Sequence, residues 1–509
     1  MLFNSYAFVL AFLPLALLLY HSLRHLQRPR LAFASLVLMS FVFYGWWNVN
    51  YIPLLLGLMT ITYGIGRLLI RYRGKSRGAA QLLLALGLAI NVLALGYFKY
   101  ANFFIDNINA LFGIDFVLSA VILPIGISFF VFQKIAFLVD AYRGNVTHLD
   151  PLNFALFVMF FPQLIAGPIV HHSEVMPQFA DPKPLRRDYI NMGLTIFVLG
   201  LGKKIWLADT MATFASPVFD AAAQGRALDF ATAWAGALAY TTQLYYDFSA
   251  YSEMAVGIAL LFGIRLPINF NSPYKANDII EFWRRWHITL SRFLRDYVYI
   301  SLGGNRHGKV RRYGNLLATM VIGGFWHGAG WNFVVWGLLH GMYLAVNHAW
   351  RDWHTQRKRG APSGMAMRLV SALLTLLAIV VAWVFFRAAD LHTALSMLSS
   401  MVGQYDSTTT TSPNELALHA TSAPAIINNT LALAYTGALL LFARFAPNTH
   451  EWVGYTGVQD TEPPIDAPQH VHRQRRWRAT HQWALWMGVL LALDLAGLST
   501  ISEFIYFQF

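Results

Sequence analysis

The chain has 509 residues, of which 56% are hydrophobic and 12% are charged, and its mean hydropathy is +0.45. Charged residues make up about a quarter of an ordinary soluble domain, so this composition excludes a soluble globular protein and indicates a polytopic membrane protein. The absence of cysteine excludes disulfides and thiolate metal sites, and basic cytoplasmic loops explain the net charge of +13 better than nucleic-acid binding does.

The first apolar segment, from Ser5 to about Leu23, is predicted to be a retained membrane helix. No basic residue precedes it, and RHLQRPR (24–30) follows it directly. This charge order is the reverse of that in a cleavable signal peptide, and it predicts an N-terminus on the outer side. A helical pair over about 31–47 and 52–70 then returns the chain to the basic stretch RYRGKSR (71–77), which is also predicted to be cytoplasmic.

Two apolar runs further along the chain, PIGISFF (124–130) and FPQLIAGP (161–168), contain Pro and Gly. Irregular backbone at membrane depth is tolerated only where it is buried in protein or lines a cavity. We therefore expect broken or re-entrant helices in these two places. Asp247, in YYDFSAYSE (245–253), is predicted to be a buried carboxylate whose partner the sequence does not identify.

The stretch EFWRRWHITLSRFLRDYVYI (281–300) is strongly amphipathic. At 100° per residue its charged side chains fall on one face and its apolar side chains on the opposite face. This pattern predicts one helix that lies at the surface of the inner leaflet. His287 is expected at the border between the two faces, where the pattern supports a lipid-headgroup anchor and a catalytic or ligand-binding role equally.

A basic loop, LGGNRHGKVRR (302–312), follows this stretch. Its spacing is that of a phosphate-binding P-loop, but Val310 stands where a magnesium-binding Ser or Thr is required, which excludes that interpretation. Arg306, Lys309, Arg311 and Arg312 could still receive the phosphates of a nucleotide-bearing donor. Ordinary anchoring of a cytoplasmic loop explains most of these charges.

Two histidines, His327 and His340, lie within the apolar run GGFWHGAGWNFVVWGLLHG (323–341). An ionisable side chain at membrane depth is a functional candidate. A helix that rises from Arg312 would carry His327 roughly 22 Å into a core about 30 Å thick. The neighbouring glycines permit a break that turns this imidazole towards a cavity, although a buried structural histidine is the alternative. On a continuous helix His340 would lie near the outer end and on another face, so a structural role is expected for it.

The C-terminal part is predicted to add further spans. QYDSTTTTSPNE (404–415) belongs to a stretch without Lys or Arg, which predicts an outer loop over 388–426. A span near 427–443, a cytoplasmic loop over 445–481 that contains RQRRWR, and a final span over about 482–499 follow. The C-terminus is therefore expected on the outer side.

Several of these motifs, in this order, resemble one known family. The run from YYDFSAYSE to LGGNR, followed by GGFWHGAGWNFVVWGLLHG, closely resembles the alginate O-acetyltransferase branch of the membrane-bound O-acyltransferase (MBOAT) superfamily. PIGISFFVFQ, FPQLIAGPIV, WVFFRA and the terminal FIYFQF resemble the same family. The resemblance implies an all-α bundle of roughly 10 to 12 spans with broken, re-entrant and interfacial helices. The chain would form a single membrane-embedded domain over 1–509, with a core at about 100–350 and extra spans over 366–509.

The resemblance also implies an activity, which is transfer of an acetyl group from a cytoplasmic thioester across the membrane for O-acetylation of an exported polysaccharide such as alginate or cellulose. The family's invariant buried histidine matches His327, and its second active-site position matches His287. We expect His327 to act as general base on the acceptor hydroxyl, and His287 to orient the thioester or stabilise its oxyanion.

The expected acyl donor is acetyl-CoA, with no tightly bound cofactor and no metal. The residues expected to bind the donor are Arg306, Lys309, Arg311, Trp283 and Trp286. The expected partners are membrane lipid, a periplasmic acetyltransferase and an exopolysaccharide biosynthesis complex, and the expected location is the inner (cytoplasmic) membrane. Two alternatives are D-alanyl transfer to teichoic acid and a non-enzymatic polysaccharide transporter or secretion scaffold.

Overall fold

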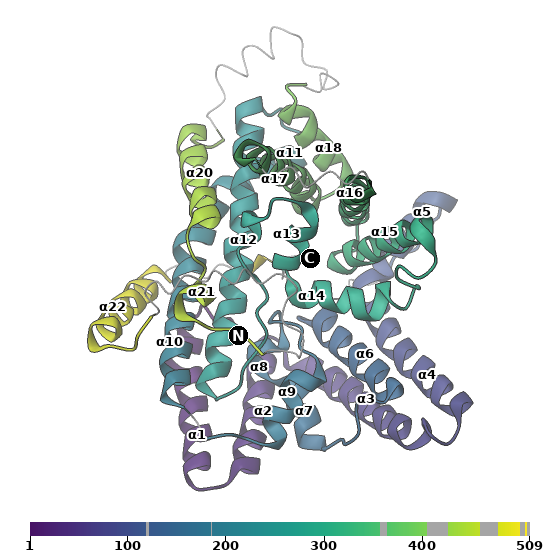
Figure 1. Cartoon of the computed structure of the whole chain (residues 1–509), viewed down its shortest axis with the longest axis vertical. Helices are drawn as coiled ribbons and strands as arrows, with labels where there is room; N and C mark the ends of the chain where they lie inside the picture. Colours follow the sequence, from purple (N-terminus) through teal and green to yellow (C-terminus); the bar gives the residue numbers. More distant parts are fainter. Residues whose placement is uncertain are drawn as a thin grey trace.

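The computed structural model describes residues 1–118, 122–184, 186–356, 364–404, 426–458, 477–498 and 504–505. Within these ranges the regular structure is all helical, and no β-strand is present. Among the described residues, five helical stretches are long and apolar enough to cross a membrane, judged by length and composition. The chain is therefore an all-α membrane protein that crosses the bilayer several times, as predicted (Figure 1).

The helices follow one another with short connections through most of the chain. In the first half they are η1 Ala7–Phe12, α1 Leu13–His25, α2 Pro29–Gly45, η2 Val49–Tyr51, α3 Ile52–Tyr72, α4 Arg77–Leu95, η3 Gly96–Tyr100, α5 Ala101–Phe112, α6 Ile127–Arg143, α7 Pro151–Met159, α8 Phe161–Leu164, α9 His172–Ala180, α10 Arg187–Gly202, η4 Lys203–Ala208, α11 Asp209–Ala223 and α12 Phe230–Leu261. In the second half they are η5 Pro273–Lys275, α13 Ile279–Arg285, α14 Ile288–Phe293, η6 Leu294–Tyr299, α15 Gly308–His327, α16 Trp331–Gln356, α17 Met365–Arg387, α18 Leu391–Met401, α20 Asn429–Phe445, α21 Thr449–Val453 and α22 His481–Gly497.

The helices predicted in the N-terminal part are present, while the side of the membrane on which the N-terminus lies stays a prediction. The first apolar helical stretch covers Ala7–His25, and the predicted pair corresponds to α2 and to the stretch Val49–Tyr72. The predicted spans near 427–443 and 482–499 correspond to α20 and α22. Most of QYDSTTTTSPNE and of RQRRWR lies outside the described residues, so the side of the membrane on which each lies stays a prediction.

The fold is organised around α12, a 32-residue helix that is buried along most of its length. Helices α10, α11, α17, α18 and α20 pack against it, and it runs through the centre of the molecule in Figure 1. Its carboxylates are paired, because Lys204 lies 2.8 Å from Asp247 and Lys203 lies 2.6 Å from Glu253. Paired burial is the condition under which such charges persist in an apolar interior. Lys204 is therefore the partner of Asp247 that sequence reasoning left unidentified.

The broken helices expected in the middle of the chain are present. Helix α6 begins directly after Gly126, whose φ is +74°, and α7 and α8 are separated by a bend at Phe160. A Cβ on Gly126 would lie 3.0 Å from the backbone of Ile165, so the segments that carry the two Pro/Gly motifs touch at this glycine.

Helices α15 and α16 form an antiparallel hairpin. Helix α15 ends at His327, which confirms the break predicted from the glycines. The two helices approach closely, because a Cβ on Gly324 would lie 2.3 Å from the carbonyl oxygen of Phe333. Directly after His340, a Cβ on Gly341 would meet Leu317, so α16 runs back alongside α15. The predicted place of His340 near the outer end is therefore wrong, since the chain reverses after His327.

The prediction of one continuous amphipathic helix over 281–300 is also wrong. Helix α13 ends at Arg285, and α14 begins at Ile288. His287 separates them with φ +41° and ψ +54°, a left-handed conformation that interrupts any right-handed helix. Because the chain turns here, His287 is fully buried and does not lie at a border between two faces.

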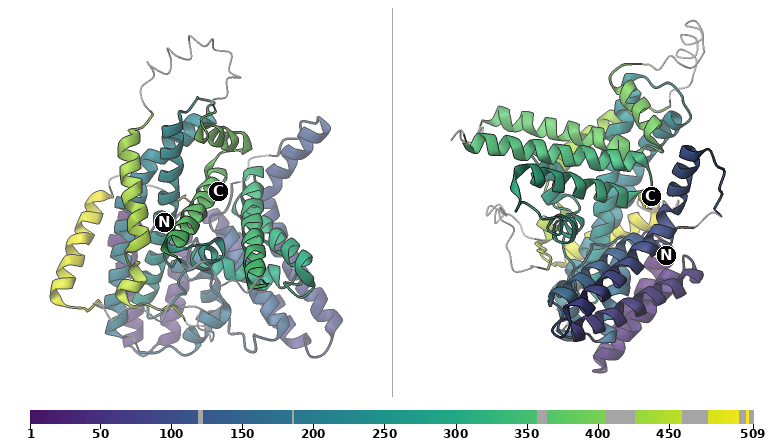
Figure 2. Two further views of the ribbon diagram at one scale, coloured as in Figure 1. Left: turned by 45° about the horizontal axis from the view of Figure 1, so that its top comes forward. Right: turned by 90° about the vertical axis from the view of Figure 1, so that its right-hand side faces the viewer.

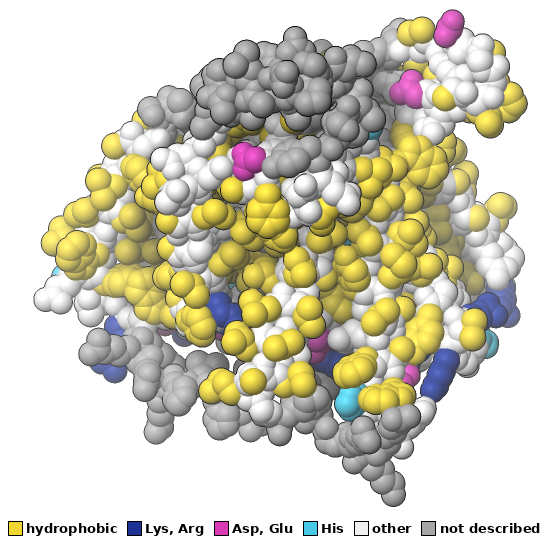
Figure 3. Space-filling model, turned by 90° about the horizontal axis from the view of Figure 1, so that it is seen from above, with side chains coloured by type: hydrophobic (Ala, Val, Ile, Leu, Met, Phe, Trp, Pro, Cys, Tyr) yellow, Lys and Arg dark blue, Asp and Glu magenta, His cyan; other side chains and the backbone are white. Residues whose placement is uncertain are grey.

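The surface of the molecule is largely apolar. Figure 3 shows one face on which apolar side chains spread over most of the area and the visible Lys and Arg side chains gather towards one edge. Figure 2 shows α5 projecting from the body, and none of its residues is buried. Both features fit a chain that is surrounded by lipid.

Substituting Gly324 by Ala should destabilise the α15–α16 hairpin. The new Cβ would overlap the carbonyl oxygen of Phe333, and overpacking of this kind costs about 1–3 kcal/mol of folding free energy. Gly314→Ala is the matched control, because a Cβ there meets nothing within 4 Å. Thermal aggregation of the detergent-solubilised protein measures the effect, and equal midpoints for the two variants would contradict the close crossing.

Candidate active site

His287 lies where two segments between α12 and α14, residues 269–271 and 285–288, are hydrogen-bonded to each other through their backbones. The backbone N–H of Asn271 donates to the carbonyl of Arg285, and the N–H of Ile288 donates to the carbonyl of Asn269, each at 2.9 Å. These bonds fix the chain on both sides of His287. Its left-handed conformation costs about 1–2 kcal/mol for a residue with a side chain, so the surrounding contacts must impose it.

The side chain of Asn269 fixes the imidazole of His287. Its Nδ2 donates to Ser252 Oγ on α12 at 3.2 Å, which leaves Oδ1 as the acceptor. Oδ1 lies 3.0 Å from His287 Nδ1 and also accepts from Thr289 Oγ1 at 2.9 Å. His287 Nδ1 must therefore carry the proton, and Nε2 of the neutral ring carries a lone pair.

Thr289 connects this junction to the FPQLIAGPIV motif. The backbone N–H of Ile169 donates to Thr289 Oγ1 at 3.0 Å. Three sequence motifs that are far apart in the chain thus meet at His287. These are the FPQLIAGPIV motif (161–170), the segment that carries Asn269, and the segment that begins α14.

His327 lies at the end of α15, beside a cavity. The cavity has a volume of about 590 Å³. Its lining includes residues of the first seven positions, the 123–129 segment, and the side chains of Trp46, Lys99 and Trp326. The ring of His327 is 4.9 Å from that of Trp326 and 5.0 Å from that of Trp336. Trp326 also neighbours His287, with ring centroids 6.4 Å apart. The two predicted histidines therefore share Trp326 as a neighbour.

His340 belongs to the same aromatic cluster, in which it contacts Trp283 and Trp336. Trp283 donates from Nε1 to His340 Nδ1 at 3.2 Å. The ring of Trp336 contacts both His340 and His327, with ring centroids 4.7 and 5.0 Å away. Trp286 packs against Trp383, with ring centroids 4.9 Å apart. Trp283 and Trp286 are thus buried around the histidines.

The basic side chains predicted to bind the donor lie elsewhere. Arg306, Lys309 and Arg311 are exposed, on the loop before α15 and on its first turn. Arg312, by contrast, is drawn inward and contacts Asp352 at 3.4 Å. The structure therefore separates the five predicted donor-binding residues into a buried aromatic pair and an exposed basic trio.

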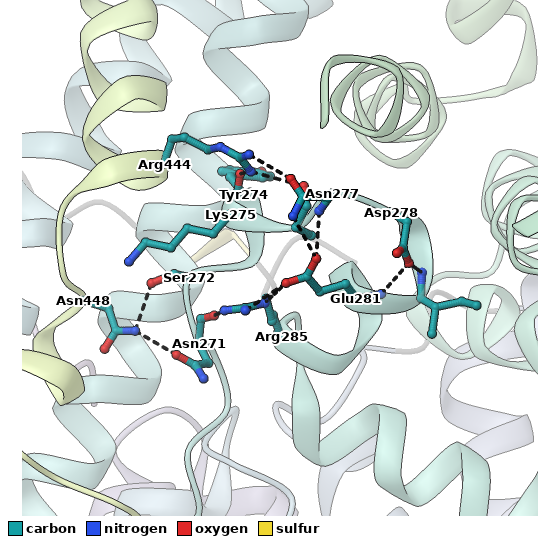
Figure 4. Close-up of polar contacts among 12 residues, drawn as sticks. Asn271, Ser272, Tyr274, Lys275, Asn277, Asp278, Glu281, Arg285, Arg444 and Asn448 are labelled. Carbon is teal, nitrogen blue, oxygen red and sulfur yellow. Dashed lines mark hydrogen bonds and ion pairs between the residues drawn. The ribbon is translucent and has the colours of Figure 1, made fainter. Parts of the chain in front are cut away.

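A polar network anchors the segment that leads into α13 (Figure 4). Asn448 donates from Nδ2 to Asn271 Oδ1 at 3.0 Å and to Ser272 Oγ at 2.9 Å, and Arg444 donates to Asn277 Oδ1 at 2.9 Å. The loop after α20 is thereby fastened to the same junction that carries His287, so the C-terminal helices contribute to the position of this histidine.

Residues near both ends of the sequence pack on α12 beside His287. Phe3 and Phe504 each stack on Tyr251 of α12, with ring centroids 4.8 and 4.5 Å apart. Ile505 donates its backbone N–H to Asp247 at 2.8 Å. Phe504 also contacts Phe248, whose ring meets the ring of His287 edge-on at 4.8 Å. The packing behind His287 therefore includes part of the FIYFQF motif.

The sequence model of the membrane-bound O-acyltransferase (MBOAT) family matches residues 8–384. The chain belongs to this family. It is 46% identical over 431 residues to the peptidoglycan O-acetyltransferase of Helicobacter pylori, covering 79% of this chain and 80% of that protein. It is 43% identical over 413 residues to a probable alginate O-acetylase of Pseudomonas aeruginosa, covering 79% and 75%. The teichoic acid D-alanyltransferase of Bacillus subtilis is 27% identical over 263 residues, which is 49% of this chain.

These similarities confirm the resemblance on which the site prediction depends, and they show that the MBOAT chain is an O-acyltransferase. Sequence reasoning missed Asn269, Lys99 and Trp326. Asn269 stands in LPINFNSPY and Lys99 in GYFKY, and a polar residue in such an apolar stretch was the available signal. Trp326 directly precedes His327, and apart from that position nothing in the sequence distinguishes it from the other tryptophans.

Asn269→Leu should lower kcat/KM for acyl transfer roughly 10- to 100-fold, because His287 Nδ1 loses its acceptor and the ring its fixed tautomer. Asn269→Asp keeps an acceptor oxygen and should recover part of the activity. Initial rates in membranes, normalised to the amount of protein, measure both variants. Equal losses in the two would mean that the acceptor oxygen is irrelevant.

Proposed function

We propose that this enzyme transfers an acetyl group from a cytoplasmic thioester, acetyl-CoA, to a hydroxyl acceptor on the outer side of the inner membrane. The acetyl group would serve O-acetylation of a polysaccharide outside that membrane. The observation that carries the proposal is that His327 lines a cavity and shares the neighbour Trp326 with His287, whose tautomer Asn269 fixes. Relatives that cover 79% of the chain are named for acetylation of peptidoglycan and alginate.

In the proposed reaction, His327 takes the proton of the acceptor hydroxyl as its oxygen attacks the thioester carbonyl carbon. The carbonyl electrons move onto oxygen, and a tetrahedral intermediate forms. Its collapse restores the carbonyl and breaks the carbon–sulfur bond, and the thiolate takes the proton from His327. His287 Nε2, which accepts but cannot donate in its neutral tautomer, receives an amide N–H of the donor and so orients the thioester.

The donor is proposed to enter from the side of the basic loop. Arg306, Lys309 and Arg311 are exposed and form no ion pair within the described part of the chain, so they are available to the phosphates of CoA. The positive-inside rule puts this loop in the cytoplasm and both termini on the outer side. The cavity beside His327 is accordingly assigned to the acceptor.

The alternatives have less support. The similarity to D-alanyltransferases covers under half of the chain, whereas the similarity to O-acetyltransferases covers 79%. A non-enzymatic transporter or scaffold is not favoured, because the chain belongs to an acyltransferase family and its buried carboxylates on α12 pair with lysines that join neighbouring helices.

His327→Ala should abolish acetyl transfer, because the base that accepts the hydroxyl proton is removed. Membranes that contain wild-type or variant protein are incubated with radiolabelled acetyl-CoA, and labelled product is counted per amount of protein. His392→Ala changes an exposed histidine of α18 and should retain full activity. A His327→Ala protein that accumulates normally and still transfers acetyl groups would refute the assignment.

The isolated protein is expected to act on a small acceptor and not on a polymer. Its cavity of about 590 Å³ accommodates one ligand of roughly drug size. We propose that a separate periplasmic acetyltransferase receives the acetyl group and passes it to the polysaccharide. Purified protein with acetyl-CoA should hydrolyse the donor slowly or acetylate such a partner. Efficient acetylation of peptidoglycan or alginate without a partner would exclude this relay.

A further inference from the structure

Lys99 is a cation in a part of the chain that is long and apolar enough to cross the membrane. It belongs to η3, a π-helical turn within the helical stretch Arg77–Phe112. Single π-helical turns inside α-helices occur frequently at functional sites. Within the described residues Lys99 forms no ion pair, because the partners of its ammonium are backbone carbonyls. A charged side chain in such a stretch is a functional candidate when no carboxylate neutralises it.

The ammonium of Lys99 contacts the end of α15. Its Nζ donates to the carbonyls of Trp326 and His327, at 2.7 and 2.8 Å. The hydroxyl of the next residue, Tyr100, donates to the carbonyl of Phe325 at 2.8 Å. The last carbonyls of a helix have no partner within it, so these bonds cap α15. A helix C-terminus favours a cation only modestly, and the neutral hydroxyl of Tyr100 caps it as well. Capping therefore requires the N–H groups of Lys99 more than its charge.

Lys99 also lines the cavity beside His327. The residue retains accessible surface, and the two residues whose carbonyls hold its ammonium line the same cavity. An ammonium group has three N–H bonds, and two of them are committed to these carbonyls. The third has no acceptor among the described residues. None of the described residues that line the cavity is Asp or Glu. The cavity therefore presents a positive charge that its own described wall does not neutralise.

We infer that the acceptor carries a carboxylate besides its hydroxyl, and that Lys99 binds this carboxylate. The inference rests on the proposed function, in which the cavity holds the acceptor, and it adds the chemical class of that acceptor. A carboxylate oxygen accepts the third N–H in a charge-assisted hydrogen bond and supplies the missing negative charge. Because the same ammonium is bound to the backbone of His327, the carboxylate anchors the acceptor beside the proposed base and orients its hydroxyl for attack.

A carboxylate fits this site better than a phosphate does. Lys99 offers one N–H, and no Arg stands among the described residues of the cavity wall. Phosphate groups carry more charge and more acceptor oxygens than one lysine N–H can bind, and Arg is the side chain that binds them with two parallel bonds. A carboxylate with a single negative charge matches one ammonium group in charge.

The test measures binding of N-benzoylserine, which has a hydroxyl and a carboxylate, and of N-benzoylserinamide, in which an amide replaces the carboxylate. Ligand-observed NMR with the purified protein, without acetyl-CoA, gives both dissociation constants. The wild type should bind the acid roughly tenfold more tightly than the amide. Lys99→Gln keeps N–H donors for the end of α15 and loses the charge, so this preference should disappear. Lys99→Arg keeps the charge and should retain a preference for the acid.

Lys75→Gln is the matched control, because it removes the same charge from an exposed residue outside the cavity wall. Its preference for the acid should equal that of the wild type. Acetate should also displace N-benzoylserine at a lower concentration than inorganic phosphate does. Equal wild-type affinities for the acid and the amide, a preference retained in Lys99→Gln, or stronger displacement by phosphate would overturn the inference.

The comparison of acid with amide in the wild type decides the matter even if Lys99→Gln fails to accumulate. Acetyl transfer and donor hydrolysis are measured separately with radiolabelled acetyl-CoA, because the binding preference does not depend on the donor. A wild type that neither transfers nor hydrolyses acetyl-CoA, while it still prefers the acid, would contradict the proposed function alone. A wild type that acetylates the acid and the amide equally well would contradict the inference alone.

Discussion

The amide oxygen of Asn269 is the contact on which the centre of this protein depends. It accepts hydrogen bonds from His287 and from Thr289, and Thr289 in turn accepts one from the backbone of Ile169. Segments from three regions of the chain are joined through this one atom and its immediate neighbour. The left-handed conformation of His287 is unfavourable in isolation and persists because these bonds are made together.

The same contact determines which nitrogen of His287 carries the proton. Because Asn269 holds the proton of His287 on Nδ1, the other ring nitrogen faces the site as an acceptor. A donor that stabilises negative charge must then be a different group. His327 completes the set at the cavity wall. The side-chain amide of Asn269, which Ser252 orients, therefore determines that His287 presents a hydrogen-bond acceptor to the site and not a donor.

The sequence predicted the features that depend on local composition. Hydropathy and the distribution of basic residues located α2 and the first apolar stretch, and the glycines after His327 predicted the end of α15. The place of His287 was wrong, because a helical projection assumes that the helix continues, and here a side chain 18 residues earlier imposes the break. The place of His340 was wrong for a related reason, since the chain reverses before reaching it. The pairing of Asp247 with Lys204 joins separate helices and leaves no periodic signal.

The two aromatic rings that stack on Tyr251 have a consequence for biogenesis. Phe3 and Phe504 lie 501 positions apart in the sequence, yet both cover the same residue of α12. Until Phe504 has been synthesised, Tyr251 and Phe248 lack one of their ring contacts, and Phe248 is the ring that packs against His287. The helices before it can enter the bilayer one after another, but the packing behind His287 is completed only when Phe504 has joined it.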